Sequence, residues 1–493
     1  MKRSKFSLSH YRLTTLDMGR LIPLTWFEAL PGDSVQHATS CLIRATPLLA
    51  PVMHPVRVRI HHFYVPNRLM WEDWEDFITG GDDGAQKPET PYLSLSEVIE
   101  GSLHDQMGVP VGDYTSNPLE VSALPYRAYN MIYNEHYRDQ DLIDELEIGK
   151  ESGEDLETTT DIKHVSWEKD YFTTARPWEQ KGNQVTIPIG ESANVVGDGA
   201  PTFREAGGGG SLLGLNHNAG DANVNWGQNG SASGRAEWND PNLLADLSTA
   251  TGITVNDLRL ALSIQRYQEA RAKFGSRYVE YLRHLGIRAS DQRLMNPEYL
   301  GGGRQTIQFS EIIQTAPDPL EQGTEVGTLR GHGIAAMRTN RYRRFFEEHG
   351  VVMTFMSVIP KTVYTSSLHK KWSRQIKEDY FQKELQFIGE QEVHNREIQA
   401  NHTEPGGVFG YQQRYDEYRT IPSSVAGEFN SIQDHWHYAR QFSGDVALNQ
   451  SFVESVPTKR PNASQETDVL YIMANHSIQA RRQLAKYPKP RTF

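Results

Sequence analysis

The stretch VRVRIHHFYVP, residues 56–66, decides the expected fold class. Val56, Val58 and Ile60 fall on one side of an extended chain and the two arginines between them on the other, because successive strand side chains point to opposite faces. A second stretch, GVVMTFMSVIP at 350–360, is apolar at almost every position, which is typical of a strand buried on both faces. Together the two stretches predict a β core whose strands lie far apart in the sequence.

Weaker strand patterns occur at 34–45, 184–189, 305–309 and 467–475. Long segments separate them and regular hairpin spacing is absent, so we expect loops that have grown into subdomains, and not alternating strands and helices. Apolar residues at three- and four-residue spacing predict a long helix from Thr254 to Gly286. Shorter helices are expected at 71–78, 127–137 and 370–381.

The composition excludes several protein classes. The 493 residues include 50 Lys and Arg against 62 Asp and Glu, a formal net charge of −12, which argues against coating nucleic acid with the whole surface. The single cysteine, Cys41, excludes an internal disulfide framework, and its apolar setting suits a buried thiol. The longest apolar stretch, 45–56, is too short and too rich in proline to cross a membrane.

The charge is distributed unevenly. Residues 1–16 contain four basic residues and no acid, and the chain after Asp468 contains five basic residues and no acid. Residues 139–157 contain nine acids and one lysine, and we expect this stretch to face solvent or a neighbour's basic patch. The basic ends can be read as solvated tails or as two anchors for a polyanion.

Residues 201–238 contain nine glycines and five asparagines and do not predict a helix or a strand core. A flexible linker is one interpretation. Its leucines and tryptophans are more apolar than a linker needs, so an exposed irregular loop is the other.

No residue pattern supports an enzyme or a metal site. His61 and His62 are adjacent, so on a strand they face opposite sides and cannot share one ion. His435 and His437 would share one face of a strand beside Asp434, which makes only half a metal site. The HExxH and GxSxG motifs are absent.

Aromatic and arginine residues crowd three irregular segments, 341–350, 411–419 and 434–442. Tyr, Trp and Arg are enriched where proteins meet, so these segments indicate an interaction or assembly protein. Packing of the same aromatic side chains in a core is the alternative.

Five ordered motifs then resemble one family. They are LSHYRLTTLDMGRLIPLTWFEALPGDSVQ at 8–36, VRIHHFYVPNRLMWEDWEDFITGG at 58–81, PEYLGG at 297–302, RRFFEEHGVVMTF at 343–355 and FGYQQRYDEYR at 409–419. The chain resembles the major capsid proteins of microviruses, the small single-stranded-DNA bacteriophages, and most closely their gokushovirus branch. The resemblance extends from residue 7 to about residue 484 and is weakest between roughly 140 and 250.

The resemblance implies a mainly β fold with helical insertions, a viral jelly roll of eight antiparallel strands. It implies a structural capsid protein, not an enzyme, that assembles into a T=1 icosahedral shell around circular single-stranded DNA. The expected parts of this single jelly-roll domain, 1–493, are an N-terminal arm (1–30), a Gly/Asn-rich threefold protrusion (183–250), a helical insertion (251–300) and a basic tail (477–493).

Three sets of site residues are expected. The basic ends would face DNA through Lys2, Arg3, Lys5, Arg481, Arg482, Lys486, Lys489 and Arg491. The Gly/Asn-rich loop would face the host through Leu212, Leu213, Leu215 and Trp226. Subunits would meet through Tyr411, Arg414, Tyr415, Tyr418, Arg419 and Trp436.

The expected partners are further copies of the chain, the DNA genome, a small basic DNA-binding protein with other virion proteins, and a receptor on the bacterial surface. The protein would reside in the virion after assembly in the host cytoplasm, without cofactor or membrane insertion. A divalent cation could bridge acidic loops, although no spacing names a site. Two alternatives stay open: a jelly-roll carbohydrate-binding module, and a metal-dependent hydrolase using Asp434, His435 and His437.

Overall fold

The computed structural model describes residues 3–81, 85–183, 185, 194–197, 202–205, 215–216, 225–226, 236–240, 243–246, 255–274, 295–313, 315 and 326–486. The chain divides into two compact units. The first consists of Met1–Glu179 and Ala272–Phe493, and the second of Gln180–Arg271.

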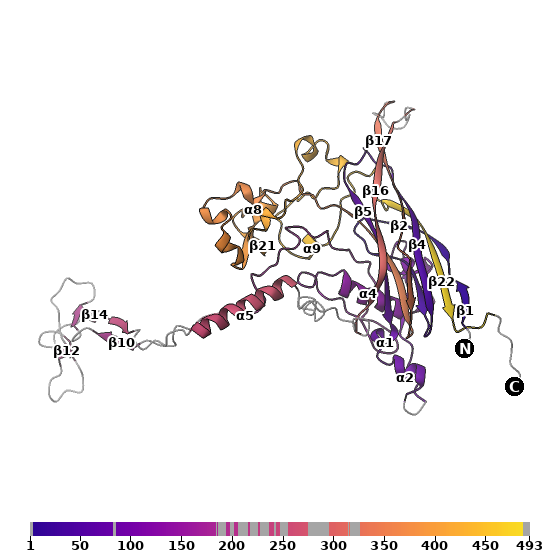
Figure 1. Cartoon of the computed structure of the whole chain (residues 1–493), viewed down its shortest axis with the longest axis horizontal. Helices are drawn as coiled ribbons and strands as arrows, with labels where there is room; N and C mark the ends of the chain where they lie inside the picture. Colours follow the sequence, from indigo (N-terminus) through magenta and orange to yellow (C-terminus); the bar gives the residue numbers. More distant parts are fainter. Residues whose placement is uncertain are drawn as a thin grey trace. The chain divides into compact units, whose positions relative to one another are not determined.

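A curled antiparallel sheet forms the first unit's framework (Figure 1). Its strands are β1 (Ser4–Ser7), β2 (His10–Leu16), β3 (Ile22–Ala29), β4 (Ser34–Ala45), β5 (Val56–Pro66), β16 (Glu298–Ile313), β17 (Leu329–Arg338), β18 (Tyr342–Phe345), β19 (Gly350–Pro360) and β22 (Leu470–Arg482). The order is β1-β22-β4-β17-β16-β5-β19-β3; β2 also pairs with β22, and β18 with β4.

The sheet is a jelly-roll-like β-sandwich, which confirms the expected mainly β class. β1 and β2 follow each other along one side of β22, and β17 and β18 along one side of β4, so ten strands fill eight positions. The long β16 joins the halves, because its first part pairs with β5 and its last part with β17.

The main core lies on the sheet's inner face. Val56, Val58 and Ile60 of β5 pack there with residues of β3, β4, β19 and β22, and the arginines between them face away, as the alternation predicts. Cys41 is buried in this core, and burial raises the pKa of its thiol to about 12. The prediction of a buried, inert thiol is therefore confirmed.

Helices cover the opposite face of β5 and β19, which explains why all eleven residues of β19 are buried. The covering helices are α1 (Asn67–Met70) and α4 (Leu124–His136), while α3 (Leu103–Met107) packs on β3 and α2 (Trp74–Thr79) follows α1 without a buried residue. The short strands in this part of the chain are β6 (Tyr92–Leu95), β7 (Glu97–Val98), β8 (Gly112–Asp113) and β9 (Leu119–Ser122). Tyr129 and Ile132 of α4 pack in one cluster with Phe355 of β19.

Residues between β19 and β22 form a region of turns with little regular structure. It contains β20 (Glu390–His394), β21 (Val408–Gln413), α8 (Asn395–Ile398), α9 (Gln450–Val453) and several 3-10 turns. The helix expected at 370–381 is wrong, because this segment has only the 3-10 turns Lys370–Trp372 and Lys377–Asp379.

The second unit contains the whole Gly/Asn-rich segment. Its described strands pair as three antiparallel sheets of two strands: β10 (Asn194–Gly197) with β15 (Leu243–Asp246), β11 (Thr202–Glu205) with β14 (Ala236–Asp240), and β12 (Leu215–Asn216) with β13 (Asn225–Trp226). The sequence did not predict these pairs. The expected long helix is described as α5 (Val255–Phe274), and the strand expected at 184–189 lies outside the described residues apart from residue 185.

The two basic ends of the chain lie side by side in the sheet. β1 pairs with the last part of β22, so that Lys5 is opposite Arg481 (Figure 1). Residues 477–482, expected as the start of a basic tail, belong to β22, and most of the expected arm 1–30 is in strands β1, β2 and β3. Ladder hydrogen bonds stabilise these ends as strands, since a long partner strand was available.

Candidate assembly surface

A concentration of exposed apolar side chains lies in the turn region between β19 and β22. We call it the apolar turn surface, and its members are Trp372, Ile376, Tyr380, Phe381, Phe387, Ile388, Tyr418, Ile421, Phe429 and Ile432. Phe387 is 85% exposed, Ile421 81% and Trp372 74%. Large exposed apolar patches mark places where a protein binds another surface.

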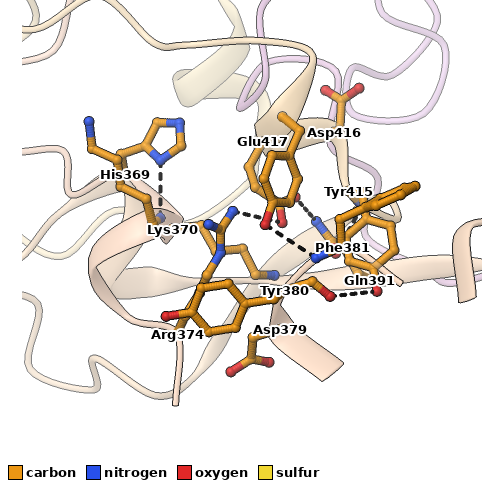
Figure 2. Close-up of polar contacts among 12 residues, drawn as sticks. His369, Lys370, Arg374, Asp379, Tyr380, Phe381, Gln391, Tyr415, Asp416 and Glu417 are labelled. Atoms are coloured by element: carbon orange, nitrogen blue, oxygen red, sulfur yellow. Dashed lines mark hydrogen bonds and ion pairs between the residues drawn. The ribbon is translucent and has the colours of Figure 1, made fainter. Parts of the chain in front are cut away.

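Tyr415 holds the backbone beneath this surface (Figure 2). Its hydroxyl lies 3.2 Å from the carbonyl oxygen of Glu378 and 3.1 Å from that of Tyr380, and it accepts the N–H of Gln382 at 3.2 Å. Tyr415 is the one non-glycine residue of the described chain with a positive φ, 64°. Backbone in this region of φ is costly for a tyrosine and persists only where surrounding contacts fix it.

The buried ion pair of Arg374 and Glu417 lies next to the exposed ring of Tyr418 (Figure 2). Glu417 accepts a hydrogen bond from Gln391 Nε2 at 2.7 Å, and its Oε1 lies 3.7 Å from Nη2 of Arg374. The Arg374 guanidinium also lies over the ring of Tyr418 at 4.2 Å and over that of Tyr380 at 5.4 Å. These contacts fix the two exposed rings in place, which lowers the entropy that they would lose on binding.

Lys370 links two parts of the turn region, and Glu397 connects them to Tyr171 outside it. Its Nζ donates to the carbonyl oxygen of Glu392 at 3.0 Å and lies 3.9 Å from Oε1 of Glu397. The buried Glu397 accepts the hydroxyl of Tyr171 at 3.1 Å. Burial raises the pKa of Glu397, and the charge of Lys370 partly opposes this rise. The part of the apolar turn surface around Tyr380 and Tyr418 therefore stands on a fixed base.

The expected interface residues differ in how far their side chains are exposed. Tyr418 and Arg419 are exposed, whereas Tyr415 is buried and acts inside the region. Tyr411, Arg414 and Trp436 are half-buried. The aromatic and arginine pattern thus located the region but not its most exposed members.

Trp372 was missed because it lies in the segment expected as a helix, and Phe387 and Ile421 were missed because neither belongs to an expected helix or strand. For Phe387 and Ile421, the sequence signal that could have found them is the lack of a helical or strand period. Apolar residues that follow neither a helical nor a strand spacing have no core face to occupy.

The expected DNA-facing residues fall into three groups. Arg3, Lys5, Arg481 and Lys486 are exposed. Arg482 faces the other way and pairs with the buried Asp33 at 3.0 Å. Lys2, Lys489 and Arg491 lie outside the described residues.

The expected host-facing residues are only partly described. Leu215 and Trp226 are backbone partners in the pair β12–β13. Leu212 and Leu213 lie outside the described residues.

Asp434, His435 and His437 do not have the strand arrangement that the metal hypothesis required. Asp434–Trp436 form a 3-10 turn and not a strand, and the buried His437 places Nε2 2.8 Å from the carbonyl oxygen of Phe429. Within the described ranges no three His, Cys, Asp or Glu side chains are grouped to hold a metal ion. His62 faces the core and His61 contacts Tyr137 on the other side, so the prediction that they cannot share an ion is confirmed. In the same described part of the chain, no helix has the length and apolar character of a membrane span.

Comparison with known proteins gives consistent matches. The sequence profile of the family described as "Capsid protein (F protein)" matches residues 1–492. Capsid protein VP1 of Bdellovibrio phage phiMH2K is 36% identical over 482 residues, covering 92% of this chain and 88% of the relative. The VP1 capsid proteins of Chlamydia phage 1 and Spiroplasma virus 4 are 31% and 30% identical, and the matches cover 92% of this chain and 89% and 87% of the relatives.

Proposed function

The chain belongs to the capsid protein (F protein) family, and from this membership we propose that copies of it build a small T=1 icosahedral shell around circular single-stranded DNA. Its role as a structural capsid protein of the microvirus type follows from the VP1 relatives. This family is not known to be enzymatic, and none of these relatives supports the carbohydrate-binding alternative.

The observation that carries the assembly part of the proposal is the apolar turn surface. Its side chains are exposed, and around Tyr380 and Tyr418 they are held in place by Tyr415 and Arg374. We assign it to contact with a neighbouring copy of the chain. A closed shell repeats each contact at every equivalent position, so a modest free energy per contact is sufficient.

Substitution of two surface residues tests this assignment. We expect Phe387→Ser and Ile421→Ser to raise the protein concentration needed for shell formation by roughly tenfold each, because burying such a side chain contributes about 1.5–3 kcal/mol. Sedimentation velocity and electron microscopy would measure shells against free subunits. Circular dichroism would show that the variants fold.

The matched control is Leu156→Ser. Leu156 has the same 85% exposure as Phe387 but lies in the acidic stretch, outside the apolar turn surface. It should leave the assembly concentration unchanged. If Phe387→Ser, Ile421→Ser and Leu156→Ser all assembled at the same protein concentration, the apolar turn surface would not be part of the contact between copies.

The remaining parts of the proposal rest on the family resemblance. The basic ends would face the genome, with a small basic protein and other virion proteins sharing the packaging of the DNA. The segment 183–250 would form an outer protrusion that contacts a receptor on the host bacterium. Protease treatment of intact particles tests the protrusion, which should be cut before the chain ends.

A further inference from the structure

Two rows of side chains lie across four strands on the sheet's outward face. Directly opposed residues of an antiparallel sheet share one face, so the register defines each row. The first row is Lys5, Arg481, Ser34 and Phe345, and the second is Ser7, Gln479, Gln36 and Arg343. The residues between the rows, such as Ala480 and Val35, are fully buried, which shows that the rows face away from the core.

These eight side chains include three cations and no acid. Lys5, Arg343 and Arg481 are all exposed, and no ion pair joins them to an acid within the part of the chain that the structure describes. Arg3 adds a fourth cation, since its guanidinium lies 5.0 Å from the centre of the Phe345 ring. In a chain with net charge −12, this face is a local concentration of positive charge.

The same face continues along β22 to a third row that carries one exposed aromatic ring. A third row contains Tyr11, Asn475, Ser40 and Arg338. It lies about 20 Å from the first row, because a strand rises roughly 3.4 Å per residue. Tyr11 is 70% exposed and Arg338 is also exposed. A cation therefore stands beside an exposed ring at the Phe345 end, while Tyr11 and Arg338 place a ring and a cation at opposite sides of the third row.

We propose that this surface, the basic sheet face, binds unpaired DNA by contacting phosphates through Lys5, Arg343 and Arg481 and stacking a base on Phe345. The inference rests on the proposed capsid function and extends it to a site on the folded sheet. Cations alone would attract any polyanion. The exposed rings favour a single strand, because only unpaired bases offer their faces for stacking.

The surface also differs from the site that the sequence indicated. Arg343 and Phe345 lie more than a hundred residues from either chain end, and only the pairing of β18 with β4 brings them beside Lys5 and Arg481. Arg482, in contrast, is used internally by Asp33. A folded strand surface holds its cations at fixed spacing, which a mobile tail does not.

Fluorescence anisotropy of the unassembled full-length chain with a labelled oligothymidine tests the proposal. The triple variant Lys5→Gln/Arg343→Gln/Arg481→Gln should bind at least tenfold more weakly at low salt. The slope of log K against log salt concentration should flatten by about 2, since each single-strand phosphate contact contributes roughly 0.7. Phe345→Leu should weaken binding about tenfold with the slope unchanged, because stacking does not release counterions.

The control triple is Lys87→Gln/Lys150→Gln/Lys169→Gln, which removes the same charge from exposed positions elsewhere. It should keep most of the affinity. Equal losses in both triples would overturn the proposal, as would a duplex of the same length binding as tightly as the single strand. An unchanged affinity in Phe345→Leu would exclude stacking at this position.

Shell formation is measured separately on the same variants. The basic-face triple should still form shells, but with less DNA, seen as a lower ratio of absorbance at 260 nm to 280 nm. Normal oligothymidine binding by a chain that forms no shells would contradict the proposed function and leave this site intact. Normal shells with unchanged DNA content in the triple would contradict the site alone.

Discussion

Three buried histidines lie together between the two halves of the sheet. The ring of His37 lies 4.6 Å from that of His62 and 5.7 Å from that of His476. Thr39 Oγ1 contacts both His37 Nε2 at 3.1 Å and His476 Nδ1 at 3.0 Å. Burial, together with smaller repulsion from neighbouring histidines, lowers the pKa of His37 to about 2 and those of His62 and His476 to about 3.

These lowered pKa values predict loss of stability in acid. In the unfolded chain these histidines bind protons as the pH falls below about 6.5, and in the folded chain they do not. Their full contribution to the free energy of unfolding is therefore present above that pH and is lost as the pH drops towards 3. We expect about 2 kcal/mol of loss per histidine between about pH 7.5 and pH 5. Urea unfolding at both pH values would measure it.

The variant His62→Gln isolates one member of this cluster. Its loss of stability between the two pH values should be smaller by about 2 kcal/mol than that of the natural chain. His402→Gln, at a half-buried histidine far from the cluster in sequence, should keep the full loss. An identical pH dependence in the natural chain and His62→Gln would contradict the prediction.

The acidic stretch 139–157 is partly internal, contrary to the expectation that it faces solvent. Asp155 pairs with Arg127 at 2.7 Å, and their side chains are 0% and 1% exposed. Burial raises the pKa of Asp155, but hydrogen bonds from Thr158 and the Arg127 guanidinium outweigh this, and the net pKa is lowered. The pair therefore neutralises a carboxylate inside the protein.

Removing Arg127 should be costly because it leaves this carboxylate buried and unpaired. We expect Arg127→Met to lower the free energy of unfolding by about 3–5 kcal/mol. Arg68→Met breaks the half-exposed pair with Glu348 and should cost less than about 1 kcal/mol. Urea unfolding would measure the free energy of unfolding of both variants. Equal losses in the two would contradict a special cost for the buried pair.

At the scale of elements, the turn between β2 and β3 depends on one glycine. Gly19 has φ +88°, and its N–H donates to the carbonyl oxygen of Val358 in β19 at 2.8 Å. A Cβ at this position would collide with the carbonyl oxygen of Ser455. Only a residue without a side chain allows the turn and the segment before β22 to approach this closely.

Gly19→Ala and Gly101→Ala separate backbone strain from collision. Gly101 has φ +74° with nothing within 4 Å of an added Cβ, so alanine should cost about 1 kcal/mol. Gly19→Ala adds a clash with backbone and should cost at least about 3 kcal/mol. Thermal unfolding measures both, and similar midpoints would mean that the segment near Ser455 moves aside.

At the scale of the whole molecule, the two proposed surfaces should respond oppositely to salt. Contact through Phe387 and Ile421 removes apolar area from water, which sulfate salts strengthen. Binding through Lys5, Arg343 and Arg481 releases counterions and weakens as salt rises. Ammonium sulfate should therefore promote shells, measured by light scattering, while oligothymidine is released. Weaker assembly at high salt would indicate a contact dominated by charge.

The sequence predicted the elements that depend on local pattern. The alternation at 56–66 and the apolar run at 350–360 are β5 and β19, and the spacing after Thr254 is α5 as far as residue 274. The segment 370–381 was mistaken for a helix. There Trp372, Ile376 and Phe381 are exposed and bury no common face, so helical propensity had no packing to support it.

By itself the sequence determined the β class, the buried Cys41, the isolated charge of the chain ends and the family. Only the tertiary structure decided that these ends are strands, that Arg482 is used internally and that Arg343 and Phe345 join Lys5 and Arg481. The physical reason is that strand period is a local property of the chain. The register between strands hundreds of residues apart depends on which strand faces pack together in the common core. No local sequence pattern specifies that packing.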